Sequence, residues 1–372
     1  MRVALVHDFL SQRGGAERVV LQLARTLRDP VIVTSLYAPD DTYPDFAEFP
    51  VLSPRHVSGP AARRFRAHVL SYPGTFRSFD LSGFDLVVIS SSAFAHHVTH
   101  PRSAVFWHTP PRFLYDPGSY LPWAPRFPLT PALNAATRPL RRRDGRAAGS
   151  HRLHAANSRR TAARLRQAYG FDAPVLHPPL DAEGFPSSPA PYRGPDRALV
   201  VSRLLPYKRV DLAIAACRQA GIPLTVIGAG PDGGRLQRMA DDSVTFRSGL
   251  SDTELVEAYA QHSLVLCPGQ EDFGYIPIEA AYAGRPVVAA AGAGADETVL
   301  HGTSGLLVRG TDPTVWSRAI ERALGRTWRP ALLHDSASRF SADRFSARLA
   351  DWLSPLADPS DLFGPVPQEV SA

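Results

Sequence analysis

The sequence predicts an α/β protein built from two doubly wound domains. Apolar runs of strand length alternate with helical stretches in both halves of the chain, which is typical of parallel sheets covered by helices. The 372 residues, 44% of them hydrophobic, provide enough core for two domains. A proline-rich segment separates the first alternating pattern from the second.

In the first half, an apolar strand at 3–6 leads through a glycine pair into a helix at 16–27. Further elements are predicted as strands at 31–34, 86–90, 104–107 and 153–156 and a helix at 158–169. Seven prolines between Pro110 and Pro131 predict a loop-rich insertion, because proline cannot donate a backbone hydrogen bond.

The second half restarts the alternation. Strands are predicted at 198–201, 224–227, 244–246, 264–267 and 286–289. Helices are predicted at 210–219, 235–240, 276–283, 295–300 and 314–324. Ser251 stands three residues ahead of Glu254, the spacing of a capping box, so another helix begins there.

These patterns define the expected domain organisation. We expect an N-terminal domain at 1–180, a linker at 181–196 and a C-terminal domain at 197–335, followed by a helix at 336–353 that packs back on the first domain and a flexible tail at 354–372. Residues 1–190 carry 23 arginines against 14 acids, whereas the rest carries 18 basic residues against 21 acids, so the +6 net charge belongs to the first half. Ligands of such sheets bind beyond the carboxyl ends of the strands, which we expect to face a shared cleft.

Composition excludes several classes. The two cysteines, Cys217 and Cys267, imply neither a disulfide framework nor a cysteine metal site. The first residues reach His7 and Asp8 too soon for a signal peptide, and no apolar run approaches the ~20 residues that span a bilayer. We therefore expect a soluble cytoplasmic protein.

Two strand-to-helix turns contain residues suited to anions. Gly14 and Gly15 leave backbone amides accessible at a helix start, although they could equally serve only to turn the chain. Arg203 and Lys208, the sole lysine of the chain, follow the first strand of the second domain. A guanidinium fork and a compact ammonium charge there suit a pyrophosphate. The adjacent Arg209 is interpreted as merely solvated.

A pair of carboxylates follows the strand at 264–267. Glu271 falls in the loop and Glu279 on the next helix, and carboxylates accept hydrogen bonds from sugar and ribose hydroxyls. Gly274 between them would let backbone amides reach a phosphate. Asp272 is interpreted as a charge in the first helical turn.

Together these motifs resemble the retaining glycosyltransferases of family four, which have the GT-B fold of two Rossmann-like domains. The resemblance rests on Ser202-Arg-x4-Lys, on Glu271-x7-Glu and on the Gly-Gly loop, in this order. It extends through most of residues 1–325, including Asn157-Ser-Arg-Arg, His177-Pro-Pro-Leu-Asp and the segment starting at Ala280-Ala-Tyr-Ala-Gly-Arg-Pro.

The resemblance implies a role for each motif residue. The donor-binding set comprises Gly14, Gly15, Arg203, Lys208, Leu250, Gly274, Tyr275 and Glu279. Arg203 and Lys208 match residues that hold the donor diphosphate, and Glu279 matches one that binds the ribose. Glu271 matches a residue that contacts the transferred sugar, and Gly15 one that approaches the phosphate. Leu250 would line the nucleobase pocket.

The segment Phe-Trp-His108-Thr-Pro-Pro-Arg resembles the place where the family keeps a histidine near the reacting sugar. We therefore predict His108 and Glu271 as catalytic residues, with a plain strand-end histidine as the alternative for His108. No His or Cys cluster has metal-ligand spacing, so we expect no metal and no other cofactor. A front-face retaining displacement is the family default.

Two other function classes stay open. Gly228-Ala-Gly-Pro-Asp-Gly233 spells the fingerprint of a nicotinamide-dependent oxidoreductase, but it follows the second strand of its domain rather than the first. Ten arginines lie between Arg138 and Arg166 with only Asp144 opposing them, which suggests nucleic-acid binding. Stacking aromatics are missing from that stretch, so an anionic membrane surface fits better, with a solvated surface as the plain alternative.

The sequence thus predicts a metal-independent retaining hexosyltransferase that uses a nucleotide diphosphate sugar, with GDP-mannose favoured. The expected acceptor is lipid-linked or a polysaccharide, in cell-envelope or exopolysaccharide synthesis. Arg141, Arg142 and Arg143 are predicted to present the acceptor side to the inner face of the plasma membrane. No nucleic-acid partner is expected.

Overall fold

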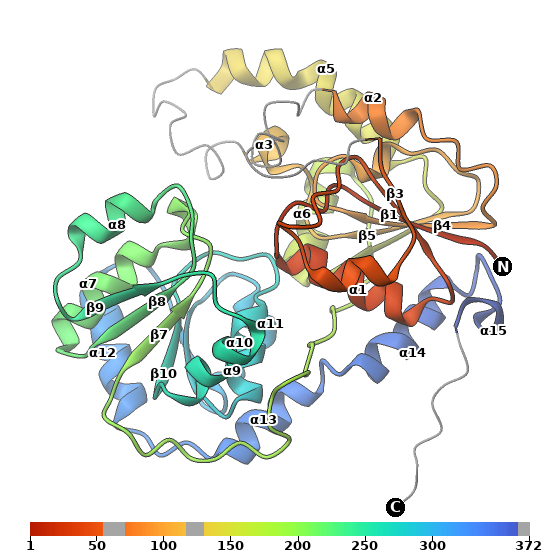
Figure 1. The fold of residues 1–372 in the computed structure, drawn as a ribbon. Helices are drawn as coiled ribbons and strands as arrows, with labels where there is room; N and C mark the ends of the chain where they lie inside the picture. Colours follow the sequence, from red (N-terminus) through yellow and green to blue (C-terminus); the bar gives the residue numbers. More distant parts are fainter. Residues whose placement is uncertain (55–70, 117–129, 364–372) are drawn as a thin grey trace, which may run out of the picture. The chain divides into compact units, whose positions relative to one another are not determined.

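The computed structural model describes residues 1–54, 71–116 and 130–363, and within 130–136 only the backbone (Figure 1). The chain divides into two compact units. Unit 1 comprises Met1–Pro179 together with the C-terminal stretch from Ala342, and unit 2 comprises Leu180–Ser341. Each unit contains one six-stranded sheet whose strands are all parallel.

The sheet of unit 1 has the strand order β3-β2-β1-β4-β5-β6. Its strands are β1 (Val3–His7), β2 (Val31–Thr34), β3 (Val51–Leu52), β4 (Leu86–Ser91), β5 (Ser103–Trp107) and β6 (Leu153–Ala156). The order runs outward from β1 in both directions, so the switch point lies between β1 and β4, where Val6 pairs with Ile89. Ligands of doubly wound sheets bind beyond the strand ends at this point.

The helices of unit 1 cover both faces of this sheet. They are α1 (Gly15–Thr26), α2 (Tyr72–Arg77), α3 (Arg112–Tyr115), α5 (Thr130–Ala148), α6 (Arg159–Tyr169), α14 (Ala342–Leu353) and α15 (Pro359–Leu362), with 3-10 turns η1 (Pro44–Glu48) and η3 (Ala95–His97). Alternate strand residues explain the two faces: Trp107 joins the core with Leu165 of α6, whereas Phe106 meets Phe345 of α14.

The sheet of unit 2 repeats the same topology as β12-β11-β10-β7-β8-β9. Its strands are β7 (Ala198–Val201), β8 (Leu224–Ile227), β9 (Val244–Arg247), β10 (Leu264–Cys267), β11 (Val287–Ala290) and β12 (Gly305–Val308). The helices are α7 (Val210–Ala220), α8 (Gly233–Met239), α9 (Asp252–Ala260), α10 (Tyr275–Tyr282), α11 (Ala295–Thr298), α12 (Pro313–Leu324) and α13 (Pro330–Ser338), with the 3-10 turn η4 (Pro206–Lys208). The switch point lies between β7 and β10.

Two apolar clusters sandwich this second sheet, as buried parallel strands require. Leu264 and Leu266 of β10 point to the cluster that holds Trp316 of α12, and the intervening Val265 points to the cluster that holds Tyr259 of α9. The predicted capping box at Ser251 is confirmed, because its hydroxyl accepts from the amide of Glu254 and the carboxylate of Glu254 reaches back. The predicted fold class, α/β with two doubly wound sheets, is confirmed.

The structure corrects several sequence predictions. The insertion at 110–131 is not free of regular structure, because α3 lies within it and α5 begins at Thr130; its residues 117–129 lie outside the described part. The single helix expected at 336–353 is split into the end of α13 and α14. The tail expected to be flexible forms α15, and the amide of Arg28 donates to the carbonyl of Leu362; 364–372 are outside the described residues.

Among the described residues, no helix combines the length and apolar character needed to cross a bilayer.

Candidate active site

The loops after β7 and β10 bring two predicted residues together at the switch point of unit 2. Nζ of Lys208 lies 2.7 Å from Oε1 of Glu271, although 62 residues separate them in the chain. The Lys208 side chain is 13% exposed and that of Glu271 29%, so the pair is partly shielded from water yet open to a ligand. An ammonium and a carboxylate at a strand-end switch point suit a ligand with both phosphate and hydroxyl groups.

Close backbone packing fixes Lys208. The 3-10 turn η4 holds it, with its amide donating to the carbonyl of Leu205, and Arg209 then adopts a left-handed φ of 54° to start α7. A Cβ at Gly269 would lie 2.8 Å from Cα of Lys208, so only glycine permits the β10 loop to pass the turn. The neighbouring Arg209, interpreted as merely solvated, forms an ion pair with Asp211.

Glu279 occupies a different environment from Glu271. It is 3% exposed on α10, and its Oε2 accepts a 2.6 Å hydrogen bond from the hydroxyl of the buried Tyr259. This bond fixes one carboxylate oxygen and orients the other. The two predicted carboxylates are therefore distinct: Glu271 is tied to a cation near the surface, and Glu279 is buried in the first turns of a helix.

The remaining predicted donor residues of unit 2 follow the same sheet edge. Arg203 is exposed directly after β7, and Leu250 is half buried after β9. Gly274 caps α10 with a left-handed φ of 89°, a conformation that favours glycine, and Tyr275 begins the helix with its ring edge-on to Phe273. Among the predicted residues of unit 2, the described contacts connect Lys208 with Glu271. Arg203, Leu250, Gly274 and Tyr275 lie after strands at the same edge of the sheet.

The glycines of the nicotinamide-like fingerprint have a packing explanation. A Cβ at Gly228 would lie 1.9 Å from the carbonyl oxygen of Ser202, and one at Gly230 would lie 2.3 Å from that of Leu204. The two glycines therefore let the loop after β8 pass close to the loop after β7. No dinucleotide is needed to account for them.

In unit 1, His108 lies at the carboxyl edge of the sheet, immediately after β5. It is 8% exposed, and its Nε2 is 2.8 Å from Oγ of Ser90 on the neighbouring β4. Nδ1 of His7, at the end of β1, lies 3.0 Å from the carbonyl oxygen of Ser90. Three polar side chains thus meet at the strand ends of this sheet.

Gly14 and Gly15 sit at the start of α1, as predicted. A Cβ at Gly14 would lie 2.4 Å from Oε2 of Glu17, which is buried and accepts from Gln12 through Oε1. This contact accounts for Gly14 without a ligand, which favours its alternative as a packing residue. Gly15 is the first residue of the helix.

Sequence reasoning missed Asp8. This carboxylate is 1% exposed and accepts hydrogen bonds from the amides of residues 92–95, at 2.5–3.0 Å, and from the Ser92 hydroxyl. It therefore organises the loop after β4 from the end of β1. One feature of the sequence could have revealed Asp8: it is an acidic residue directly after the first apolar strand, at the position where the switch point forms.

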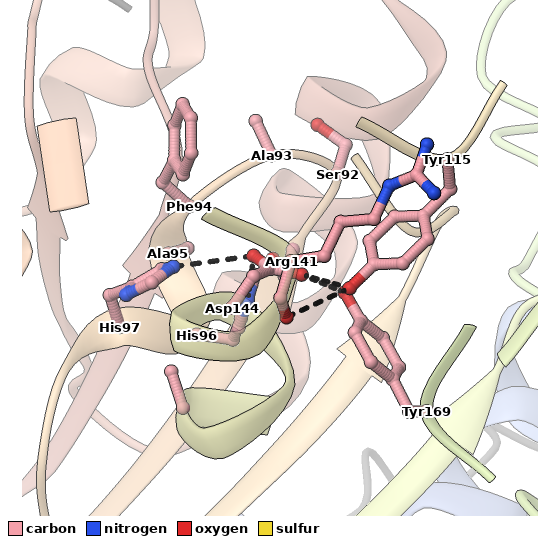
Figure 2. Close-up of polar contacts among 12 residues, drawn as sticks. Ser92, Ala93, Phe94, Ala95, His96, His97, Tyr115, Arg141, Asp144 and Tyr169 are labelled. Atoms are coloured by element: carbon pink, nitrogen blue, oxygen red, sulfur yellow. Dashed lines mark hydrogen bonds and ion pairs between the residues drawn. The ribbon is translucent and has the colours of Figure 1, made fainter. Parts of the chain in front are cut away.

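Sequence reasoning also missed a buried network around Asp144 (Figure 2). Nε2 of His96 lies 2.9 Å and Nε2 of His97 3.3 Å from Oδ1 of Asp144, and the hydroxyls of Tyr115 and Tyr169 donate to Oδ2 at 3.0 and 2.8 Å. Sequence spacing did not reveal this cluster, because the fold assembles it from residues 47 and 48 positions apart.

Hydrogen bonding determines the chemistry of this network. The ligating atoms of His96, His97 and Asp144 all lie within 4.8 Å of one another, the spacing of a possible metal site. However, Nη2 of Arg77 lies 3.3 Å from Nδ1 of His97. Since arginine only donates, Nδ1 accepts, and Nε2 carries the proton that it donates to Asp144. In this structure the polar atoms of the cluster are therefore joined to one another by hydrogen bonds.

The charges in the network shift the pKa values of its members. Burial opposes ionisation of Asp144, but the charge of His96 and hydrogen bonds from both histidines outweigh it and hold the pKa of Asp144 well below its usual value. Burial, reinforced by the negative charge of Asp144, raises the pKa of Tyr115 far above its usual value. Burial lowers the pKa of His97. Asp144 is therefore a permanent buried anion at neutral pH.

Two neighbouring histidines make stability depend on pH. Burial lowers the pKa of His151 and that of His154 from 6.5 to about 4. The unfolded chain then binds more protons than the folded one between these values, so the free energy of unfolding should fall as pH falls from about 6.5 to about 4. Urea unfolding at pH 7, 5.5 and 4 measures this. His151→Gln should give a shallower pH dependence; an unchanged slope would contradict the assignment.

The predicted acceptor surface on α5 is only partly as expected. Arg142 and Arg143 are exposed, but Arg141 is half buried, with its Nε donating to the carbonyl of Leu114 at 2.8 Å and its guanidinium over the Tyr115 ring. The membrane prediction for Arg141 is thus corrected by its inward contacts. Asp144, the sole acid of the arginine-rich stretch, points inward and does not offset the exposed positive charge.

Comparison with known proteins relates part of the chain to a family. Residues 183–334 match the family described as glycosyl transferases group 1. Over 231 residues the chain is 32% identical to the GDP-mannose-dependent alpha-(1-6)-phosphatidylinositol monomannoside mannosyltransferase of Mycolicibacterium smegmatis, covering 53% of this chain and 60% of that protein. It is 35% identical over 200 residues to the D-inositol 3-phosphate glycosyltransferase of the same organism, covering 48% and 45%. The chain thus spans between about half and three fifths of these relatives.

Solved structures show the same fold over nearly the whole chain. HepE of Anabaena in complex with UDP-glucose superposes with a TM-score of 0.66 at 20% identity, covering 95% of this chain and all of that one. Sucrose-phosphate synthase from Thermosynechococcus elongatus gives 0.68 at 18% identity, covering 96% and 99%. The predicted GT-B fold is confirmed, and residues 183–334 match the glycosyl transferases group 1 family.

Proposed function

We propose that this protein is a metal-independent, retaining glycosyltransferase that transfers a hexose from a nucleotide diphosphate sugar. The ion pair between Lys208 and Glu271, at the switch point of a group 1 domain, carries the proposal. Mannose from GDP-mannose is favoured, in line with the donor named for the mycobacterial relative. The proposed acceptor is lipid-linked or a polysaccharide at the cytoplasmic face of the plasma membrane.

The proposed chemistry is electrostatic. Breakage of the bond between the anomeric carbon and the phosphate oxygen leaves its electron pair on the diphosphate, and the sugar gains oxocarbenium character. Lys208 and Arg203 would stabilise the growing negative charge. The acceptor hydroxyl oxygen bonds to the anomeric carbon on the face that the diphosphate leaves, and its proton passes to the departing phosphate oxygen. Glu271 and His108 would hold the sugar through its hydroxyls.

A donor screen tests this proposal. The purified protein is incubated with GDP-mannose, UDP-glucose and other sugar nucleotides, without acceptor, with and without a chelator. We expect hydrolysis of GDP-mannose to exceed the others, to persist in the chelator and to release the sugar with its anomeric configuration retained. Absence of turnover with every donor, an inverted product or a requirement for divalent metal would contradict the corresponding part of the proposal.

The two carboxylates should differ in their kinetic effects. Glu279→Gln keeps an acceptor for Tyr259 but loses the charge proposed to hold ribose hydroxyls, so affinity for free GDP should fall about tenfold, as for one charged hydrogen bond. Glu271→Gln should mainly lower kcat, because its proposed partner is the transferred sugar. Calorimetry with GDP and steady-state kinetics measure the two effects. Equal losses of GDP affinity would refute the division of roles.

The exposed arginines of α5 provide a test of membrane contact. Replacing Arg142, Arg143 and Arg146 together with glutamine should reduce flotation with anionic vesicles about 100-fold, since each basic residue near such a surface contributes ~1 kcal/mol. Binding of the parent should weaken as salt rises, because charges are screened over ~8 Å at physiological ionic strength. Arg141 is left in place because its contacts are internal.

A matched control separates surface charge in general from this helix. Arg309, Arg318 and Arg322 are also exposed, on unit 2, and their triple replacement removes the same charge. Flotation of that control should match the parent. If the α5 variant also floats like the parent, the helix is only a solvated basic surface and a soluble acceptor is favoured.

A further inference from the structure

Unit 1 contains a pocket of about 380 Å³ that no motif predicted. It is lined by residues of three helices, of which α5 packs against both α3 and α6. Arg112 comes from α3, Arg141 from α5 and Arg164 from α6, and all three line the pocket. The amide side chain of Gln167 adds a donor one turn beyond Arg164.

Partial burial separates these arginines from most of the basic stretch. Arg112, Arg141 and Arg164 are half buried, whereas Arg142, Arg143 and Arg166 are exposed. Bringing three guanidinium groups together away from bulk water is unfavourable unless negative charge compensates them. Asp116 is the one carboxylate among the described lining residues, so the lining carries three positive charges against one negative.

The contacts of these side chains orient them as anion donors. Nε of Arg141 is held by the Leu114 carbonyl, which fixes the direction of the guanidinium. Arg164 lies 3.5 Å from Oγ1 of Thr109 and 3.4 Å from Oδ2 of Asp116, both at the long limit of hydrogen bonding. These two contacts place the Arg164 guanidinium at the pocket lining.

From this convergence we propose that the pocket binds a phosphate group. Planar guanidinium forks pair bidentately with phosphate oxygens, and three of them from separate helices match a tetrahedral anion better than a planar one. Thr109, which contacts Arg164, directly follows His108, so a bound phosphate would lie beside the segment predicted to meet the reacting sugar. The idea that this phosphate belongs to the acceptor rests on the proposed function. Phosphate binding by the pocket does not depend on that function.

The first arm of the test uses a soluble phosphate. Glycerol 3-phosphate is titrated into the full chain by calorimetry at constant ionic strength, without any sugar nucleotide. Arg112→Gln and Arg164→Gln should each weaken binding about tenfold or more, as expected for loss of a charge-assisted hydrogen bond. Arg166→Gln is the matched control, because Arg166 lies on the same helix but pairs with Asp172 outside the pocket, and it should bind like the parent.

The second arm identifies the source of the phosphate. Phosphatidylcholine vesicles with and without phosphatidic acid are floated with the parent and the same variants. Loss of vesicle binding in Arg112→Gln and Arg164→Gln, but not in Arg166→Gln, assigns the pocket to a lipid headgroup. Binding of glycerol 3-phosphate without selective vesicle binding assigns it to a soluble phosphorylated ligand.

Either result supports the phosphate pocket. The proposal is overturned if parent and pocket variants behave alike in both arms while thermal unfolding shows all of them folded. Donor hydrolysis without acceptor is measured in parallel. If hydrolysis is absent from the parent but phosphate binding depends on Arg112 and Arg164, the proposed function fails and the pocket stands.

Discussion

Lys208→Ala is expected to lower the affinity for GDP about 10- to 100-fold, because charge-assisted hydrogen bonds contribute ~1.5–3 kcal/mol each. The structure adds a second reason for a large loss. Without the ammonium group, the Glu271 carboxylate, now 2.7 Å from Nζ, would face the donor diphosphate uncompensated and repel it. Turnover should fall further than ground-state affinity, since negative charge on the diphosphate grows in the transition state.

Calorimetry with GDP and donor hydrolysis measure this effect. Fold stability should change by no more than about 1 kcal/mol, because a partly exposed ion pair contributes little. Arg209→Gln removes a neighbouring charge that pairs with Asp211, so it is a suitable control and should retain affinity. The double variant Lys208→Ala/Glu271→Gln should recover part of the lost GDP affinity. Unchanged affinity in Lys208→Ala would rule out a diphosphate role for this residue.

Asp8→Ala is expected to destabilise unit 1 by at least ~3 kcal/mol, since each buried donor left without a partner costs ~1–3 kcal/mol. The carboxylate serves four backbone amides and one hydroxyl of the 92–95 loop, and all of these would lose their acceptor. The loop leads directly into η3, whose histidines bond Asp144, so the damage should spread to that network.

Urea unfolding monitored by circular dichroism measures the loss. Asp80→Ala is the control, because the exposed Asp80 accepts only from the nearby Ser82 among its described bonds and should change stability by less than ~0.5 kcal/mol. Equal stability of Asp8→Ala and Asp80→Ala would show that Asp8 does not organise the loop. If Asp8→Ala is too unstable to purify, Asp8→Asn is measured instead. Asparagine keeps one oxygen acceptor, so the free energy of unfolding of this variant should lie between those of the parent and Asp8→Ala.

Local sequence was sufficient for most of the central strands. The predicted bounds at 31–34, 153–156, 198–201, 224–227 and 264–267 are those of the structure. Apart from the edge strand at 153–156, which contains His154, these strands lie inside their sheets and consist almost entirely of β-branched and aliphatic residues, as burial on both faces requires. The strand-to-helix turns that follow them could therefore also be located, and with them Lys208, Glu271 and Glu279.

Two of the edge strands, β3 and β12, were not predictable in the same way. β3 has two residues, too few for any periodicity. β12 begins at Gly305, where a Cβ would lie 2.2 Å from the carbonyl oxygen of Val287, so packing against β11 demands a residue that is depleted in strands. The helix α5 contains Pro139 and many arginines, and its inward face is anchored by the contacts of Asp144.

The sequence by itself thus determined the α/β class, the two doubly wound sheets and the chemical types of residue at their strand ends. These features could be predicted because strand burial and turn formation depend on residues that are neighbours in the chain. Only the tertiary structure decided which of those residues meet. Lys208 forms an ion pair with Glu271, and Asp8 accepts hydrogen bonds from the 92–95 loop. Arg112, Arg141 and Arg164 line one pocket. Each of these groupings joins residues far apart in the chain, and parallel crossover connections, rather than any local pattern, bring such residues to one edge of a sheet.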